Sequence, residues 1–128
     1  MRANGGRVKN ATKVSKYGID FRSKLELYTY EAFMNAGIPV KYEPKHFTLS
    51  PKLEYLGEKI RAITYLPDSI GRGSVVECKG LIGDSFPLRY KLFKYYLKRH
   101  HSKMKCYLVR NHKQVDEMIQ EIISNKKS

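Results

Sequence analysis

The sequence has few acidic residues. Asp and Glu number 12 against 25 Lys and Arg, so the formal net charge is +13 and the isoelectric point is near 9.8. A large excess of positive charge is typical of proteins that bind a polyanion. The shortage of acidic charge therefore favours a nucleic acid or an anionic membrane surface as the partner.

The sequence also has no apolar run long enough to span a bilayer, and residues 1–18 are basic without the apolar segment of a secretory signal. We therefore expect a cytoplasmic protein with no membrane partner. Nucleic acid is then the more consistent polyanion.

Cysteine is scarce: Cys78 and Cys106 are the two in the chain, and each lies in an apolar segment. Neither has a second cysteine at the spacing of a zinc site. In a reducing compartment both are expected as free thiols.

Hydrophobic residues make up 41% of the 128 residues, which suits one folded domain. Residues 1–16 are basic, lack acidic residues and have almost nothing to pack. We expect a flexible arm at 1–16, either an ordinary unstructured terminus or a phosphate contact, followed by a single domain over 17–128.

Apolar periodicity predicts an α/β domain with the order α-β-β-β-α-β-α. Ser23 with Glu26 three residues later is typical of a helix start. Pro44 would interrupt or bend the first strand. The glycines of residues 69–73 suit a hairpin between antiparallel strands. The unit 74–110 should be a parallel crossover, so we expect a mixed four-stranded sheet flanked by helices. The expected elements are helices at 23–35, 84–101 and 111–125 and strands at 38–51 (interrupted or bent), 60–67, 74–80 and 103–110.

Carboxylates and a lysine meet on the predicted hairpin. Asp68 would end one strand, while Glu77 and Lys79 share a face of the next and Cys78 points to the opposite face. Two close carboxylates repel unless a cation lies between them, and Mg²⁺ prefers such oxygen ligands, with Mn²⁺ able to substitute. The backbone carbonyl of Cys78 would add a ligand.

A carboxylate-bound Mg²⁺ beside a phosphodiester polarises the phosphoryl oxygen and lowers the pKa of a bound water. Lys79 would then orient or help to deprotonate the attacking water. This chemistry predicts a phosphodiester hydrolase, although each fragment taken alone is common among solvated surface charges.

These residues resemble the PD-(D/E)XK nuclease superfamily through Pro67-Asp68 and Glu77-Cys78-Lys79, and more narrowly the phage endonuclease I type of Holliday-junction resolvase through residues 18–26 and 76–80. The likeness runs from about Gly18 to Arg110. It implies a restriction-endonuclease-like core and a homodimeric, Mg²⁺-dependent, structure-selective endodeoxyribonuclease acting on four-way junctions. Ser69 departs from the pattern, because an apolar residue usually follows the aspartate.

The same resemblance implies that Glu26 joins Asp68 and Glu77 at the metal. The alternative is a capping box, in which Glu26 bonds back to the Ser23 backbone N–H. Glu31 is a second candidate on a different helical face. Residues 50–59 have no place in the family pattern, and their acidic residues, Glu54 and Glu58, are expected as solvated loop charges.

No acidic residue occurs between Ser85 and Val115, and Lys91, Lys94 and Lys98 recur at helical spacing. We expect that face to follow DNA phosphates through shape rather than sequence. The alternatives are a solvated helix face, a less selective nuclease, or a non-enzymatic nucleic-acid-binding module. The expected DNA-binding residues are Arg22, Lys24, Arg89, Lys91, Lys94, Lys98 and Arg99.

Overall fold

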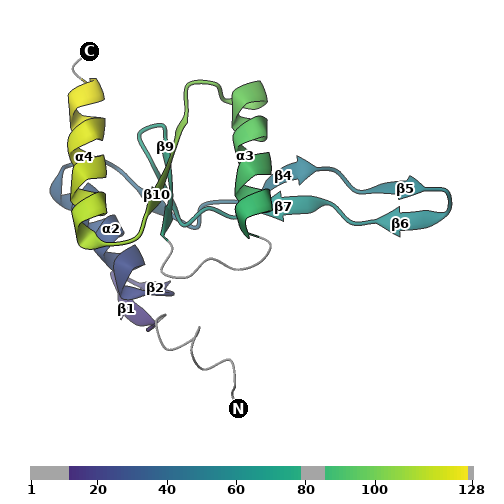
Figure 1. The fold of residues 1–128 in the computed structure, drawn as a ribbon. Coiled ribbons are helices and arrows are strands. Elements are labelled where there is room, and N and C mark those ends of the chain that lie inside the picture. The colour runs from purple at the N-terminus through teal and green to yellow at the C-terminus, as the bar shows by residue number, and fades with distance from the viewer. Residues whose placement is uncertain (1–11, 79–85, 127–128) are drawn as a thin grey trace.

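The computed structural model describes residues 12–78 and 86–126, which form helices on both sides of a mixed four-stranded sheet (Figure 1). The helices are α2 (Lys24–Asn35), α3 (Phe86–His100) and α4 (His112–Lys126). The strands are β1 (Val14–Lys16), β2 (Ile19–Phe21), β3 (Lys41–Tyr42), β4 (Phe47–Ser50), β5 (Leu53–Tyr55), β6 (Glu58–Ile60), β7 (Ile63–Tyr65), β8 (Ser69–Gly71), β9 (Ser74–Cys78) and β10 (Lys105–Val109). The expected α/β class and the mixed sheet are confirmed.

The sheet has the strand order β10-β9-β8-β3. Strands β9 and β10 are parallel, with Cys78 opposite Val109, and α3 lies between them in sequence, as the crossover prediction required. Strand β8 is antiparallel to both β9 and β3, with Ser69 opposite Val76. The central strand β9 is therefore paired along both edges.

Successive residues of β9 point into two separate cores, because side chains alternate across a strand. Val76 and Cys78 pack with the apolar faces of α2 and α4, whereas Val75 packs with α3 and the strands beside it. The first core contains Phe33, Ile38, Val109, Val115, Met118, Ile119 and Ile122, and the second contains Phe47, Tyr65, Phe86, Tyr90, Phe93 and Leu97.

The capped and periodic helices agree with prediction. Helix α2 starts after Ser23, whose Oγ accepts a hydrogen bond from the Glu26 backbone N at 3.1 Å, and ends before Gly37, which has a φ of 74°. Helix α4 buries the expected apolar stripe. The predicted cap of α3 at Asp84 or Ser85 lies outside the described residues.

Two expectations about the strands were wrong. The strand expected at 60–67 is divided into the end of β6 and β7, and neither belongs to the main sheet. Residues 69–71, expected as a turn, supply the sheet strand β8, so Asp68 precedes a strand instead of ending one.

A ribbon leaves the body of the protein between β3 and β8. Strands β4 and β7 form its base, and the β5–β6 hairpin continues it outward (Figure 1). Glu54 and Glu58 are exposed, as expected, but they lie on these strands and not in a loop. The expected loop at 50–59 is therefore corrected to a hairpin.

The last residues of the segment 1–16, expected as a flexible arm, form a strand. Residues 14–16 form β1, which pairs with β2 through a turn at Tyr17 and Gly18 with φ values of 59° and 74°. Positive φ at both central residues gives the turn whose twist suits a two-residue hairpin. The folded part thus begins before residue 17, and residues 1–11 lie outside the described chain.

Within residues 12–78 and 86–126, no helix is both long and apolar enough to cross a membrane.

Candidate metal centre

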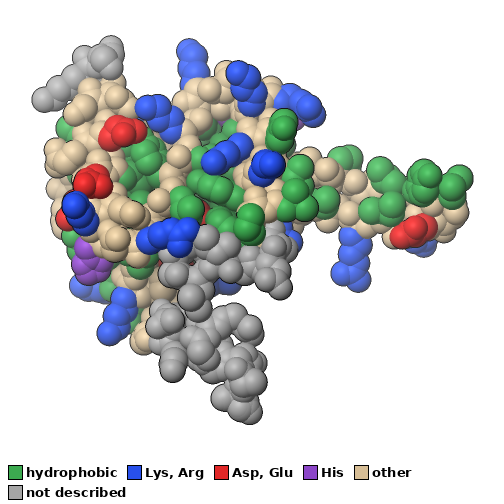
Figure 2. All heavy atoms as spheres, in the orientation of Figure 1, with side chains coloured by type: hydrophobic (Ala, Val, Ile, Leu, Met, Phe, Trp, Pro, Cys, Tyr) green, Lys and Arg blue, Asp and Glu red, His purple; other side chains and the backbone are tan. Residues whose placement is uncertain are grey.

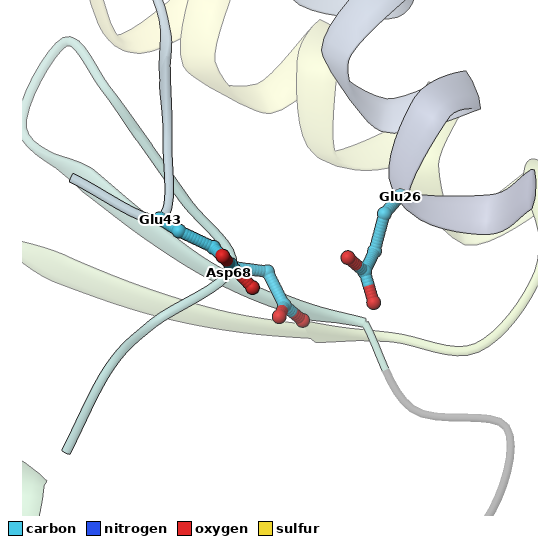
Figure 3. A group of neighbouring side chains, drawn as sticks. All are labelled: Glu26, Glu43 and Asp68. Carbon is cyan, nitrogen blue, oxygen red and sulfur yellow. The ribbon is translucent and has the colours of Figure 1, made fainter. Parts of the chain in front are cut away.

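Three carboxylates converge at the edge of the sheet where α2 begins. Glu26 comes from the first turn of α2, Glu43 from the residue after β3, and Asp68 from the residue before β8. One oxygen from each lies within 4.8 Å of the others (Figure 3). Oxygen donors of this kind are the ligands of hard divalent cations.

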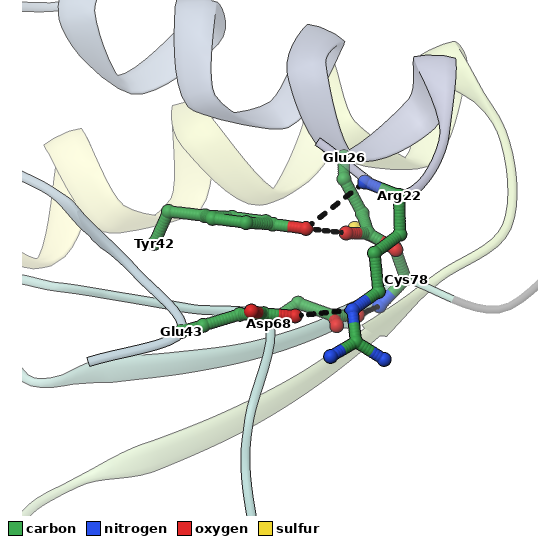
Figure 4. A network of polar contacts seen from close by, with 6 residues as sticks. All are labelled: Arg22, Glu26, Tyr42, Glu43, Asp68 and Cys78. Carbon is green, nitrogen blue, oxygen red and sulfur yellow. Dashed lines mark hydrogen bonds and ion pairs between the residues drawn. The ribbon is translucent and has the colours of Figure 1, made fainter. Parts of the chain in front are cut away.

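Glu26 is buried, and its carboxylate accepts a hydrogen bond from the Tyr42 hydroxyl (Figure 4). That hydroxyl in turn accepts from the Arg22 backbone N at 3.1 Å. Burial raises the pKa of the Glu26 carboxyl, the Tyr42 hydrogen bond opposes this rise, and the charge of Glu43 adds to it. The backbone of Glu26 takes part in the helix cap, while its carboxylate joins the cluster.

Asp68 is fixed by the backbone on both sides. Its Oδ2 accepts a hydrogen bond from the Cys78 N at 2.6 Å, and its carbonyl oxygen accepts from the Glu43 N at 2.7 Å. The second bond brings Glu43 beside Asp68 although 25 positions separate them in sequence. The pairing of β3 with β8 therefore brings together two of the three carboxylates, Glu43 and Asp68.

Glu43 was missed by the sequence analysis. It has a φ of 45° and precedes Pro44, and its Oε2 lies 2.8 Å from the Arg22 Nε. A left-handed conformation at a non-glycine residue often marks a constrained, functional position. The one sequence signal that could have identified Glu43 is its position directly before Pro44, where the sequence predicted a bend.

Glu77 lines the same pocket from β9 but lies outside the three-carboxylate cluster. It is 5% exposed and accepts a hydrogen bond from the Tyr65 hydroxyl. Burial and the Glu77 charge raise the pKa of Tyr65, so the hydroxyl keeps its proton and remains a donor. The structure thus groups Asp68 with Glu26 and Glu43, and places Glu77 on the wall beside them.

The remaining predicted site residues differ in their placement. Lys79 lies outside the described residues. Cys78 lines the pocket, its Sγ lies 3.3 Å from the Thr29 Oγ1, and burial raises the pKa of its thiol. Glu31 bonds to Lys16 at 2.8 Å and to Tyr17 outside the pocket, so it is not a member of the site. Cys78 and Cys106 are free thiols, as expected.

The pocket has a volume of about 670 Å³, and basic side chains are part of its lining. Arg22 and Arg89 line it, as does His46. The other expected DNA-binding residues are exposed and outside its lining, and basic side chains gather over α3 (Figure 2). These residues are Lys24, Lys91, Lys94, Lys98 and Arg99.

In the comparison with known protein families, a family model described as "Protein of unknown function (DUF1064)" matches residues 7–115. The matched range contains Glu26, Glu43, Asp68 and Glu77. No curated protein and no solved structure matches the chain significantly.

Proposed function

The chain belongs to the DUF1064 family, and we propose that it is a Mg²⁺-dependent endodeoxyribonuclease with a restriction-endonuclease-like core. The observation that carries the proposal is the convergence of Glu26, Glu43 and Asp68 within 4.8 Å in a protein of net charge +13. Negative charge gathered at one point of a basic protein is what a cation bound against a phosphodiester requires.

The donor set fits Mg²⁺ or Mn²⁺. All three side chains offer oxygen, and ligands on opposite sides of an octahedral Mg²⁺ lie about 4 Å apart. At most one pair among three ligands can lie on opposite sides, so an ion bound between these oxygens, which lie within 4.8 Å of one another, would draw them closer together. Glu26, Glu43 and Asp68 would therefore hold the ion, and water and a phosphate oxygen would complete its coordination.

The residues around this centre have separate roles in the proposed reaction. A bound divalent ion would supply Lewis-acid activation and a water of lowered pKa. Glu77, held by Tyr65, would accept hydrogen bonds from that water, and Lys79 would orient it or help to deprotonate it. Arg22 and Arg89 on the pocket rim would bind the phosphodiester.

The proposed substrate is branched DNA, and the four-way junction follows from the resemblance to phage-type Holliday-junction resolvases. The exposed lysines of α3 would follow phosphates without reading bases. Paired cuts in a two-fold symmetric junction require two active sites, so the proposal includes a homodimer.

The test is cleavage of a synthetic four-way junction and of a linear duplex of the same sequence, in Mg²⁺ and in EDTA. We expect Mg²⁺-dependent cleavage of the junction that falls by orders of magnitude in Asp68→Asn, while junction binding persists. Cleavage that continues in EDTA, or that is unchanged in Asp68→Asn, would contradict the proposal. Equal rates on both DNAs would leave a nuclease and exclude junction selectivity.

A non-enzymatic DNA-binding module is the second candidate. It is favoured by the 2.8 Å ion pair between Arg22 and Glu43, which offsets part of the acidic charge without a metal ion. Under this alternative the protein binds DNA and cleaves none in Mg²⁺ or Mn²⁺.

A further inference from the structure

The β5–β6 hairpin, Leu53–Ile60, which we call the arm, carries apolar side chains into solvent (Figure 2). Leu53 is 53% exposed, Tyr55 60% and Leu56 89%. An isolated two-stranded hairpin is at best marginally stable in water, so an apolar surface on one calls for a partner.

The register separates the arm into two different faces. Leu53 lies opposite Ile60, and Glu54 lies opposite Lys59. Residues directly opposite each other share a face, and residues two apart along a strand do so as well. One face therefore carries Leu53, Tyr55 and Ile60 together with Glu58, which lies opposite Tyr55, and the other pairs Glu54 with Lys59.

The tip of the arm is a two-residue turn at Leu56 and Gly57, with φ values of 50° and 85°. Such turns favour Asn or Asp before the Gly, because these residues tolerate positive φ. Leucine has no such advantage, and its side chain is the most exposed of the large apolar side chains of the arm. The conformation of the turn therefore does not explain why an apolar residue, Leu56, occupies the tip of the arm.

The base of the arm forms part of the candidate metal centre. Residues 62–66, which include β7, line the same pocket as Asp68 and Glu77. Strands β4 and β7 also contact α3, the helix that carries the basic face. DNA seated with a phosphate in the pocket would therefore meet the arm.

We propose that the arm is a DNA wedge, which inserts Leu56 and Tyr55 between unstacked bases at a branch point. The inference rests on the proposed function and adds the device that selects branched DNA. A DNA groove admits a two-stranded ribbon, and apolar side chains of groove-binding proteins enter opened base steps. Base steps at a branch are already partly unstacked, so insertion there costs less than in a continuous duplex.

The size and charge of the arm are consistent with this role. The eight residues from Leu56 to Ile63 span seven steps, or about 23 Å at the usual rise of a strand, which exceeds the depth of a DNA groove. The arm itself has one basic residue, Lys59, against Glu54 and Glu58, but Lys52 and Arg61 flank it, so the net charge over residues 52–61 is +1. A second copy of the chain is the competing occupant, although a net charge of +13 on each copy opposes that association.

The test uses Leu56→Asn in the full chain. Asparagine suits the turn, so the melting temperature should not fall and lost binding cannot be attributed to misfolding. The matched control is Met34→Gln, which replaces a 44% exposed apolar residue on α2 by a polar residue of similar size. Binding is measured in EDTA, which prevents metal-dependent cleavage, on a four-way junction and a linear duplex.

We expect the ratio of junction affinity to duplex affinity to fall about tenfold in Leu56→Asn and to stay unchanged in Met34→Gln. A 2-aminopurine base beside the branch should brighten when the wild-type protein binds and should not brighten with Leu56→Asn. An unchanged ratio, or no brightening with the wild type, would overturn the wedge. So would a change in molecular mass of Leu56→Asn without DNA, which would assign the arm to a second copy.

The two proposals fail separately. Cleavage by the wild-type protein in Mg²⁺ decides the proposed function, and the affinity ratio in EDTA decides the wedge. A junction nuclease whose Leu56→Asn variant keeps the full ratio would lack the wedge, and a chain that binds junctions through the arm without cleaving them would lack the activity.

Discussion

The Tyr65 hydroxyl donates a hydrogen bond to the Glu77 carboxylate, and both side chains are buried beside the acidic cluster. Tyr42 makes the same kind of bond to Glu26. Each tyrosine occupies one oxygen of a carboxylate and so restricts the orientation of the other. Carboxylate direction at this site therefore depends on hydroxyl groups that come from neighbouring strands.

Tyr65→Phe should lower both stability and metal-dependent cleavage. Removing a donor from a buried carboxylate costs about 1–3 kcal/mol, and a less firmly held Glu77 positions water less well. Urea unfolding and cleavage rates measure the two effects. The matched control is Tyr107→Phe, which removes an exposed bond to Glu121 and should cost about 0.5 kcal/mol or less. Equal losses in the two variants would contradict a special role for Tyr65.

Glu43→Gln should weaken cation binding, because it removes one of three converging carboxylates. A cation at about 100 times its dissociation constant stabilises the folded state by about 2.7 kcal/mol, so Mg²⁺ should raise the wild-type melting temperature. We expect most of that rise to disappear in Glu43→Gln and to remain in Glu54→Gln, which alters an exposed carboxylate on the arm. An identical rise in Glu43→Gln would exclude Glu43 as a ligand.

The raised pKa of Glu26 predicts a particular pH dependence. Between its ordinary value of 4.5 and its raised value, the folded state binds more protons than the unfolded state. The free energy of unfolding therefore falls as pH rises through this interval. Glu26→Gln should remove that fall and be more stable than the wild type at neutral pH in EDTA, yet cleave no DNA. Parallel pH profiles for the two proteins in urea would show that Glu26 does not carry this effect.

Replacing Lys91, Lys94 and Lys98 together by alanine should make DNA binding less dependent on salt. Each phosphate contact contributes about 0.9 to the slope of log affinity against log salt concentration, so three lost contacts reduce its magnitude by about 2.7. Fluorescence anisotropy over a salt series measures the slope. Lys113→Ala on α4 is the control and should change it little. A slope unchanged in the triple variant would remove α3 from the interface.

Ser69→Ala should stabilise the protein. The Ser69 Oγ is buried and has no hydrogen-bond partner among the described residues, and an unsatisfied buried hydroxyl costs about 1 kcal/mol or more. Ser23→Ala is the contrasting variant, because it removes a helix cap and should destabilise by about 1 kcal/mol. Melting temperatures that shift in opposite directions would confirm both assignments, and a lower value for Ser69→Ala would indicate a partner for its hydroxyl.

The helices were predictable from sequence because each signal is local. Ser23 and Gly37 mark the ends of α2, and apolar spacing marks the buried face of α4. The strand at 60–67 was misassigned because β-branched and aromatic residues suit an outer ribbon as well as a central sheet. Its boundary is fixed by pairing with β4, which is a tertiary contact.

The candidate site was predictable in part, because some of its residues belong to local sequence motifs. Asp68 and Glu26 were identified through short motifs, whereas Glu43 reaches the cluster through a backbone hydrogen bond to Asp68 across the sheet. That bond exists only after β3 pairs with β8. No pattern near Glu43 in the sequence indicates which residue it will meet.

Strand β9 pairs with both β8 and β10, and this pairing determines when the cation site can form during synthesis of the chain. The three clustered carboxylates emerge from the ribosome first, but the strand that holds Asp68 through the Cys78 N also needs β10, which comes later in the chain, after α3. A nascent chain released before β10 would contain every clustered carboxylate and lack the parallel neighbour of β9. We therefore expect cation binding to appear late and abruptly as the chain lengthens, so that truncated products are inert.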